Sequence, residues 1–121
     1  MIEGEQATDR IKAVSFVDDM NKVDTKVIDA LFRTLNNDKN INVRLVSLET
    51  LAKFATIAKV REDLVKSIEL QDSPIVLLEL AEILIQLQDK KSLKELQNLL
   101  NNEDLDPNLR LTIESGLKKV I

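Results

Sequence analysis

The feature that most constrains the fold of this chain is an apolar pattern that returns at a fixed interval. It starts in the stretch 42–54, NVRLVSLETLAKF, and recurs twice downstream. Val43, Val76 and Leu109 are evenly spaced (76 − 43 = 109 − 76 = 33), and Leu51, Leu84 and Leu117 have the same spacing, which we call the repeat interval. Repeats of this length are typical of helical hairpins that stack on their neighbours. The sequence therefore predicts an all-α chain of stacked helix pairs.

Each repeat is expected to contain two helices. The first helices are predicted near 24–36, 59–70 and 90–101, and the second helices near 41–56, 74–88 and 107–120. The turns that join them, NNDKN, QDSP and NNEDLDP, supply residues that end one helix and cap the next. Pro74 and Pro107 suit a first helical turn, where no backbone donor is missed.

The N-terminal segment matches the repeat interval poorly. Residues 1–5 are polar and are expected to fray, whereas 6–20 has helical spacing of apolar residues, with Thr8 as a candidate N-cap. A polar turn at 21–24 follows, and Asp24 or Thr25 is expected to cap the next helix. We interpret 6–20 as a capping half-repeat. The prediction is one right-handed helical-repeat domain, 6–121, with seven helices and repeats at about 24–56, 59–88 and 90–121.

Composition excludes several classes of chemistry. The 121 residues contain no Cys and no His, so thiolate or imidazole zinc sites, His-activated nucleophiles and disulfides are excluded. The net charge of −4 argues against nucleic acid and acidic membranes as partners. The longest apolar run, 75–85, is interrupted by Glu79 and Glu82 and is shorter than the roughly 20 residues of a membrane span. No catalytic constellation can be assembled, so we expect neither an enzyme nor a cofactor.

The helix pairs resemble a known repeat family. The pattern D-x-x-V-R-x-x-A-x-x-A-L of HEAT repeats is similar to this chain over roughly 24–120, although Leu77 replaces the arginine of the middle unit. The residues that carry the resemblance are Asp38, Val43, Arg44, Ser47 and Leu51, with Asp106, Leu109, Arg110 and Leu117. The resemblance implies an α-α superhelix that acts as a scaffold.

A second, narrower resemblance concerns the amino-acid sequence of the first two repeats. TLNNDKNINVRLVSLETLAKF and VREDLVKSIELQDSPIV are similar to the HEAT-like C-terminal regions of some bacterial membrane-anchored anti-sigma-factor-like proteins. In those proteins a cytoplasmic zinc-finger segment and one membrane helix precede the repeats. The resemblance implies a regulatory, extracytoplasmic role if the chain is an excised domain. The start of the chain lacks the features of a signal peptide, so a complete chain would be cytoplasmic.

Two sets of polar residues have alternative interpretations. Asp38, Asn40, Asn42 and Glu49 occupy positions 1, 3, 5 and 12 of an EF-hand-like loop, but position 6 is Val43 and the helix would have to unwind. Helix capping is therefore the favoured interpretation.

Arg44 and Arg110 could clamp an anion, or could tie neighbouring repeats through acidic turn residues such as Asp38 and Asp72. We favour the structural role.

The outward face of the second helices is the candidate site. If Val43, Ser47, Thr50, Leu51 and Phe54 face the first helix, then Leu45, Glu49 and Ala52 point the opposite way. The equivalent positions downstream are Leu78, Glu82 and Ile85, then Leu111, Ser115 and Lys118. We name Leu45, Leu78 and Leu111 the leucine ladder.

Exposed apolar rows commonly mark interaction sites. The sequence predicts a non-catalytic module, a monomer or weak homodimer, that binds a partner helix or peptide along the leucine ladder. The acidic residues beside the ladder would select basic flanks. The alternative is a structural or self-associating domain in which a terminal segment, a second copy or a tighter superhelix buries the ladder.

Overall fold

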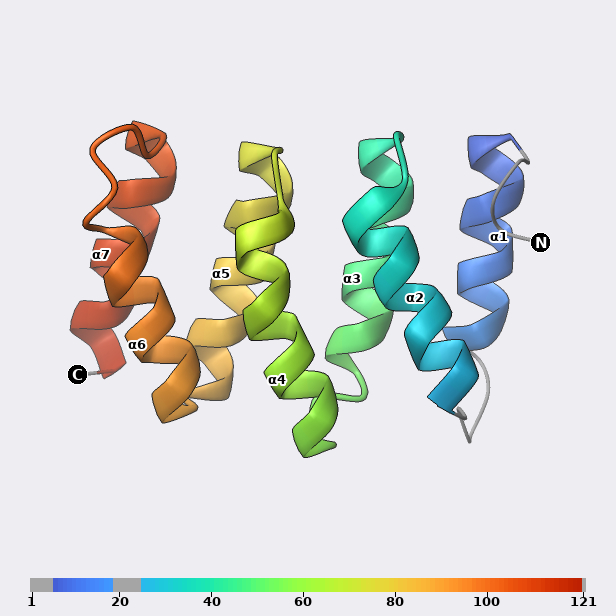
Figure 1. Cartoon of the computed structure of the whole chain (residues 1–121), viewed down its shortest axis with the longest axis horizontal. Coiled ribbons are helices and arrows are strands. Elements are labelled where there is room, and N and C mark those ends of the chain that lie inside the picture. Colours follow the sequence, from blue (N-terminus) through green and yellow to red (C-terminus); the bar gives the residue numbers. More distant parts are fainter. Residues whose placement is uncertain (1–5, 19–24, 121) are drawn as a thin grey trace. The chain divides into compact units, whose positions relative to one another are not determined.

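A computed structural model of the chain describes residues 6–18 and 25–120, with the backbone alone for 15–18 (Figure 1). Within these ranges the chain forms seven α-helices and one short 3-10 helix, and has no strand. The predicted all-α class is confirmed. The predictions for Asp24, for the turn at 21–24 and for the apolar side chains of the segment 15–20 lie outside the described residues.

The helices match the predicted order. Their bounds are α1 Ala7–Asp18, α2 Thr25–Asn37, α3 Ile41–Ala52, α4 Ala58–Ser67, η1 Ile68–Leu70, α5 Pro74–Leu87, α6 Lys90–Leu99 and α7 Pro107–Val120. Two predicted ends were wrong. Thr8 lies inside the first turn of α1 rather than at its N-cap. The helix predicted to reach residue 56 ends at Ala52, because the amides of Lys53, Phe54 and Ala55 bond to carbonyls three residues back.

Polar side chains in the turns cap the helices. Asn40 accepts hydrogen bonds from the amides of Asn42 and Val43 at the start of α3. Ser73 caps α5 ahead of Pro74, and Asp89 caps α6. The bonds to Asn40 are the capping role that we favoured over a calcium loop.

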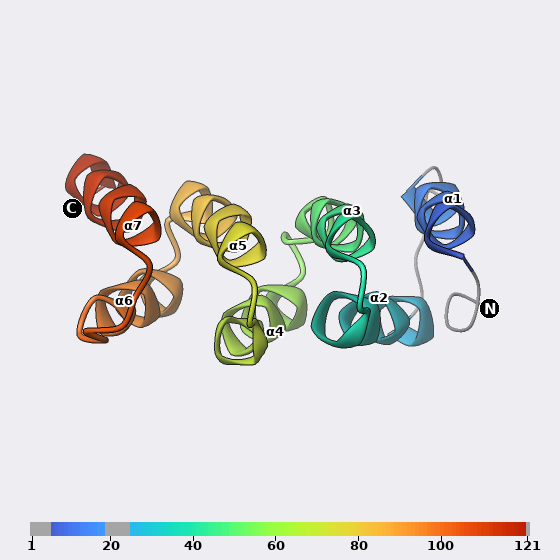
Figure 2. The ribbon, with the colours of Figure 1, turned by 90° about the horizontal axis from the view of Figure 1, so that it is seen from above.

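The chain divides into two compact units, Met1–Asp63 and Leu64–Ile121, with the border inside α4. In the first unit α3 packs against both α2 and α1. In the second unit α5 packs against α6 and α7, and α6 also packs against α7. Figure 2 shows the same layering within each unit, since α2 faces α1 and α3, and α6 faces α5 and α7.

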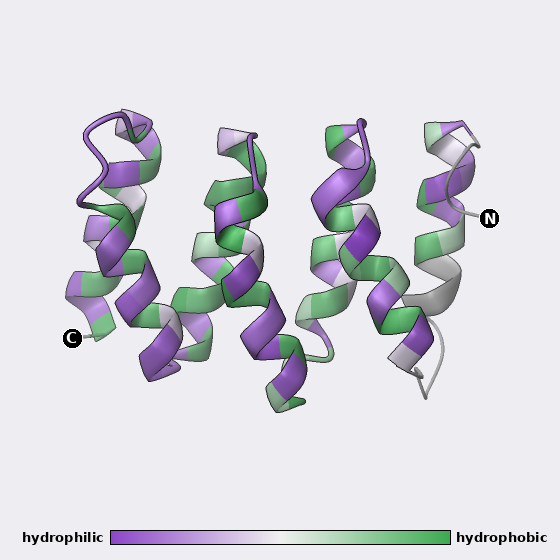
Figure 3. Ribbon diagram, in the orientation of Figure 1, coloured by the Kyte–Doolittle hydropathy of each residue, from purple (hydrophilic) through white to green (hydrophobic). Residues whose placement is uncertain are grey.

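The core is aliphatic and follows the repeat interval. Each described helix carries both apolar (green) and polar (purple) positions, interspersed along its length, as Figure 3 shows. Six residues that define the interval are all buried: Val43, Val76, Leu109, Leu51, Leu84 and Leu117. Ser47 is also fully buried on α3, and its hydroxyl has no hydrogen-bond partner among the described residues. Phe54 lies in the turn after α3 and is only half-buried.

Candidate interaction surface

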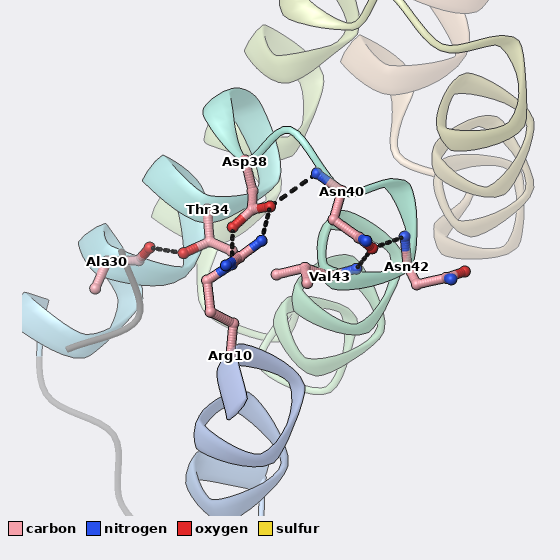
Figure 4. A network of polar contacts seen from close by, with 7 residues as sticks. All are labelled: Arg10, Ala30, Thr34, Asp38, Asn40, Asn42 and Val43. Carbon is pink, nitrogen blue, oxygen red and sulfur yellow. Dashed lines mark hydrogen bonds and ion pairs between the residues drawn. The ribbon is translucent and has the colours of Figure 1, made fainter. Parts of the chain in front are cut away.

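A buried ion pair fastens α1 to the rest of the first unit (Figure 4). Arg10 Nε lies 2.7 Å from Asp38 Oδ2, and Arg10 Nη2 lies 3.1 Å from Asp38 Oδ1. The two side chains are only 6% and 7% exposed. Asp38 Oδ1 also accepts a hydrogen bond from the amide of Asn40 at 2.9 Å. The carboxylate of Asp38 thus joins α1 to the turn between α2 and α3.

Arg44 and Arg110 play matching roles within their own helix pairs. Arg44 Nε donates to the carbonyl of Leu35 at 3.1 Å, near the end of α2. Arg110 donates to the carbonyls of Leu100 and Asn102, at 2.7 and 2.6 Å, beyond the end of α6. A cation is favourable at a helix C-terminus, where carbonyls lack helical partners. These bonds tie the second helix of a pair to the first. The expected tie between neighbouring repeats through acidic turn residues stays a prediction.

Sequence reasoning missed Arg10. The repeat interval does not align α1 with the later helices, but an interval longer by one position does. It relates Arg10 to Arg44 and Val14 to Leu48 (44 − 10 = 48 − 14 = 34). Val14 and Leu48 are both fully buried. A search that allowed the interval to vary by one position would have identified α1 as equivalent to the second helix of a repeat, with Arg10 in the position of Arg44.

A shallow hollow of about 240 Å³ lies beside this ion pair, lined by Arg33, Thr34, Asn37 and Asp38. Its polar groups are engaged locally: Thr34 Oγ1 donates to the carbonyl of Ala30, and Asn37 Nδ2 donates to the carbonyl of Arg33. In residues 6–18 and 25–120 there is no group of three or more acidic side chains that could hold a metal ion. No helix in that part of the chain is long and apolar enough to cross a membrane.

In the second unit, the ladder residues lie on two helices that pack together. Leu78, Glu82 and Ile85 are on α5, and Leu111 is on α7. Leu78 and Ile85 are half-buried, and Glu82 is exposed. Leu111 is 66% exposed, which is high for a leucine in the middle of a packed helix pair. The predicted surface is therefore open at Leu111 and partly covered on α5.

The partial cover of Ile85 on α5 comes from α7. A Cβ added to Gly116 would lie 2.5 Å from Ile85 Cδ1, so the two helices approach closely at this glycine. The equivalents of Ala81 and Ile85 on α7, one repeat interval later, are Glu114 and Lys118 (114 − 81 = 118 − 85 = 33). Ala81 is buried, whereas Glu114 and Lys118 are exposed. Leu111 is thus an exposed apolar residue, with exposed Glu114 one turn and exposed Lys118 two turns further along α7.

In the first unit, the corresponding face belongs to α3. Leu45 and Ala52 are half-buried, and Glu49 is exposed. On the other side of the same helix Val43, Ser47, Thr50 and Leu51 are buried, as the periodicity predicted.

One exposed ion pair lies on α4. Lys59 Nζ is 3.1 Å from Asp63 Oδ1, one helical turn away. The hydrogen bond from Lys59 to Asp63, and then the charge of Asp63, raise the pKa of Lys59 above the ordinary 10.5. When the pKa of a lysine is higher in the folded state than in the unfolded state, the interaction stabilises the fold at pH values below the unfolded-state pKa. This stabilisation is lost as the pH rises through the folded-state pKa. The pair is exposed and supports α4 locally.

Comparison of the chain with protein-family models, curated proteins and solved structures found no match. Function is therefore inferred from the surface chemistry of the described residues.

Proposed function

We propose that the chain is a non-catalytic protein-interaction module, built as a right-handed, HEAT-like stack of helix pairs. Three observations support this proposal. The helix order follows the repeat, the residues at the repeat interval are buried, and Arg44 and Arg110 make equivalent bonds in two different pairs. Stacked helix pairs commonly present one helix face as an extended binding surface.

The observation that carries the proposal is the exposure of Leu111. At 66% it is the most exposed of the large apolar side chains in the described ranges. It lies on α7, which packs against the helix that carries Leu78 and Ile85. A partner that covered Leu111 and the exposed part of Leu78 would remove apolar area from water without a change of fold.

The charges beside these leucines indicate the chemistry of the partner. Glu82 on α5 and Glu114 on α7 are exposed in the second unit, and Glu49 is exposed on α3 in the first. The partner is an amphipathic helix or extended peptide whose apolar residues contact the ladder and whose Lys or Arg residues face the glutamates. The weaker of the two resemblances extends the proposal to a regulatory, extracytoplasmic domain of a bacterial protein.

A displayed library of basic amphipathic peptides tests the surface directly. Peptides selected on the native protein should bind Leu111→Asp at least about tenfold more weakly, since the change places a charge in the apolar contact. Glu82→Lys should weaken binding most at low salt. Lys66→Glu, an exposed change on α4, is the control and should bind normally. Selected peptides that bind all three variants equally would contradict the proposal.

The second candidate is a structural or self-associating domain. The half-burial of Leu45 and Leu78 favours it, because a ladder that is already partly covered offers less surface to a partner. Light scattering coupled to size exclusion separates the two. A stable dimer that Leu111→Asp converts to monomers would identify the ladder as a contact between copies.

A further inference from the structure

The charges of the second unit are separated along its helices. The helices α5 and α7 start at one end, where the turns 71–73 and 101–106 also lie, and finish at the other, where α6 starts (Figure 1). Four exposed acidic residues define the acidic end: Glu69, Asp72, Glu103 and Asp104. Exposed Lys66 in the last turn of α4 and half-buried Arg110 at the start of α7 lie near the same end, where acidic residues still predominate. Five exposed lysines define the lysine end: Lys90, Lys91, Lys94, Lys118 and Lys119. The overall charge of −4 conceals this separation.

Helix stability does not account for the lysine end. Lys118 and Lys119 lie in the last turn of α7, where cations are favourable, but Lys90 and Lys91 begin α6, where they are unfavourable. Asp89 is the acidic residue nearest to them in sequence, and its carboxylate accepts hydrogen bonds from the amide and hydroxyl of Ser92. The lysines at the start of α6 therefore face water at a cost to the helix.

The acidic end has features that fit lysine side chains. Leu70 and Ile75, on either side of the turn 71–73, are each 58% exposed. Lysine stems cover apolar surface while their ammonium groups stay in water or contact carboxylates. Glu69 is next to Leu70 in sequence, Asp72 lies in the turn between Leu70 and Ile75, and both acidic residues are exposed. The acidic end thus offers both an apolar contact for the stems and carboxylates for the ammonium groups.

We infer that the lysine end of one copy docks on the acidic end of a second copy, in a weak head-to-tail contact. The contact uses none of the ladder residues, so it goes beyond the proposed peptide-binding surface. Because each copy carries both ends, the contact is heterologous and adds copies in a row. Exposed ion pairs are individually weak and are screened by salt, so the association depends on protein concentration and on ionic strength.

Sedimentation equilibrium of the full chain tests this contact. At about 0.01 M salt, where the screening length is about 30 Å, the average mass should rise with protein concentration. At about 0.15 M salt, where that length is about 8 Å, it should fall back toward the monomer mass. The variant Lys90→Glu/Lys91→Glu should remain monomeric at low salt, and so should Glu103→Lys/Asp104→Lys. A mixture of the two variants should associate again, because the unaltered lysine end of one variant can dock on the unaltered acidic end of the other, and their altered ends are also complementary.

Matched controls separate this contact from general charge effects and from the ladder. Lys12→Glu/Lys26→Glu makes the same change in net charge on exposed residues of the first unit and should associate as the native chain does. Leu111→Asp should also associate normally, whereas its loss of association would assign the contact to the ladder and overturn the inference. No rise in mass at low salt would also overturn it. A native chain that stays monomeric but binds anionic vesicles or polyphosphate through its lysines would overturn it too, by identifying a different occupant.

Discussion

At the scale of single residues, the repeat places the polar side chain of Ser47 at a core position that is apolar in the other repeats. Ser47 occupies the position of Leu80 and Ile113 in the other repeats (80 − 47 = 113 − 80 = 33), and all three are fully buried. Its hydroxyl has no partner among the described residues. A buried, unpaired hydroxyl lowers stability, because it gives up hydrogen bonds with water and gains none.

Ser47→Ala should therefore stabilise the fold. The expected gain in the free energy of unfolding is about 1–2 kcal/mol, from the removed hydroxyl and the higher helix propensity of alanine. Urea unfolding should show a higher midpoint with an unchanged slope. Ser115→Ala, at an exposed position in the middle of α7, is the matched control for propensity alone. Equal gains for the two variants would show that the Ser47 hydroxyl is satisfied.

The Arg10–Asp38 pair is the opposite case, a polar contact in which both partners are needed. Arg10→Met should lower the free energy of unfolding by about 3–5 kcal/mol, because it leaves the Asp38 carboxylate buried without its partner. Adding Asp38→Asn should recover part of this loss, since the remaining group is then neutral. A double-mutant cycle in chemical denaturation measures the coupling. Lys12→Met, an exposed change on the same helix, should cost little, and additive effects in the cycle would contradict the proposed coupling.

At the scale of helices, the sequence carried much of the information. The helix period and the repeat interval both record which face of each helix is buried, so α2 to α7 and their core residues could be predicted. The end of α3 at Ala52 could not, because no proline or glycine marks it. The role of Arg10 was hidden by a shift of one position in the repeat. The close contact of Ile85 with Gly116 depends on how two helices meet, which the pattern of a single helix does not record.

That contact leads to a prediction about coupling between α5 and α7. Gly116→Ala gains about 1 kcal/mol of helix propensity, but the new methyl group would meet Ile85 Cδ1. Because Cδ1 is the flexible end of its side chain, the two effects should nearly cancel in the single variant. Ile85→Val removes this atom and should cost roughly 0.5–1.5 kcal/mol alone. The double variant should be about 1 kcal/mol more stable than the sum of the single effects predicts.

Thermal and urea unfolding of the two single variants and the double variant measure this coupling. Ile83→Val on the same helix, also half-buried, is the control and should be additive with Gly116→Ala. If Ile85→Val were also additive with Gly116→Ala, the two helices would be able to separate slightly at no cost in stability. A glycine at position 116 would then not be required for the close approach of α5 and α7.

At the scale of the whole molecule, the chain consists of two compact units, each with its own buried aliphatic residues. In the first unit α1 contributes Val14, which is fully buried, and Arg10, which pairs with Asp38. The helix α3 therefore packs against α2 on one side and α1 on another. A helix pair that loses a neighbour exposes an apolar face that it cannot bury alone.

Deleting residues 1–20 should for this reason lower the stability of the first unit and leave α3 the most affected helix. Its face toward α1 would be exposed to water, and Asp38 would lose its ion pair. We expect hydrogen exchange of the α3 amides to become much faster, with a smaller change in α7 of the second unit. Equal acceleration in α3 and α7 would show that the two units unfold together. Unchanged exchange in α3 would show that α1 is not a stabilising cap, and the assignment of α1 as part of the repeat would then be wrong.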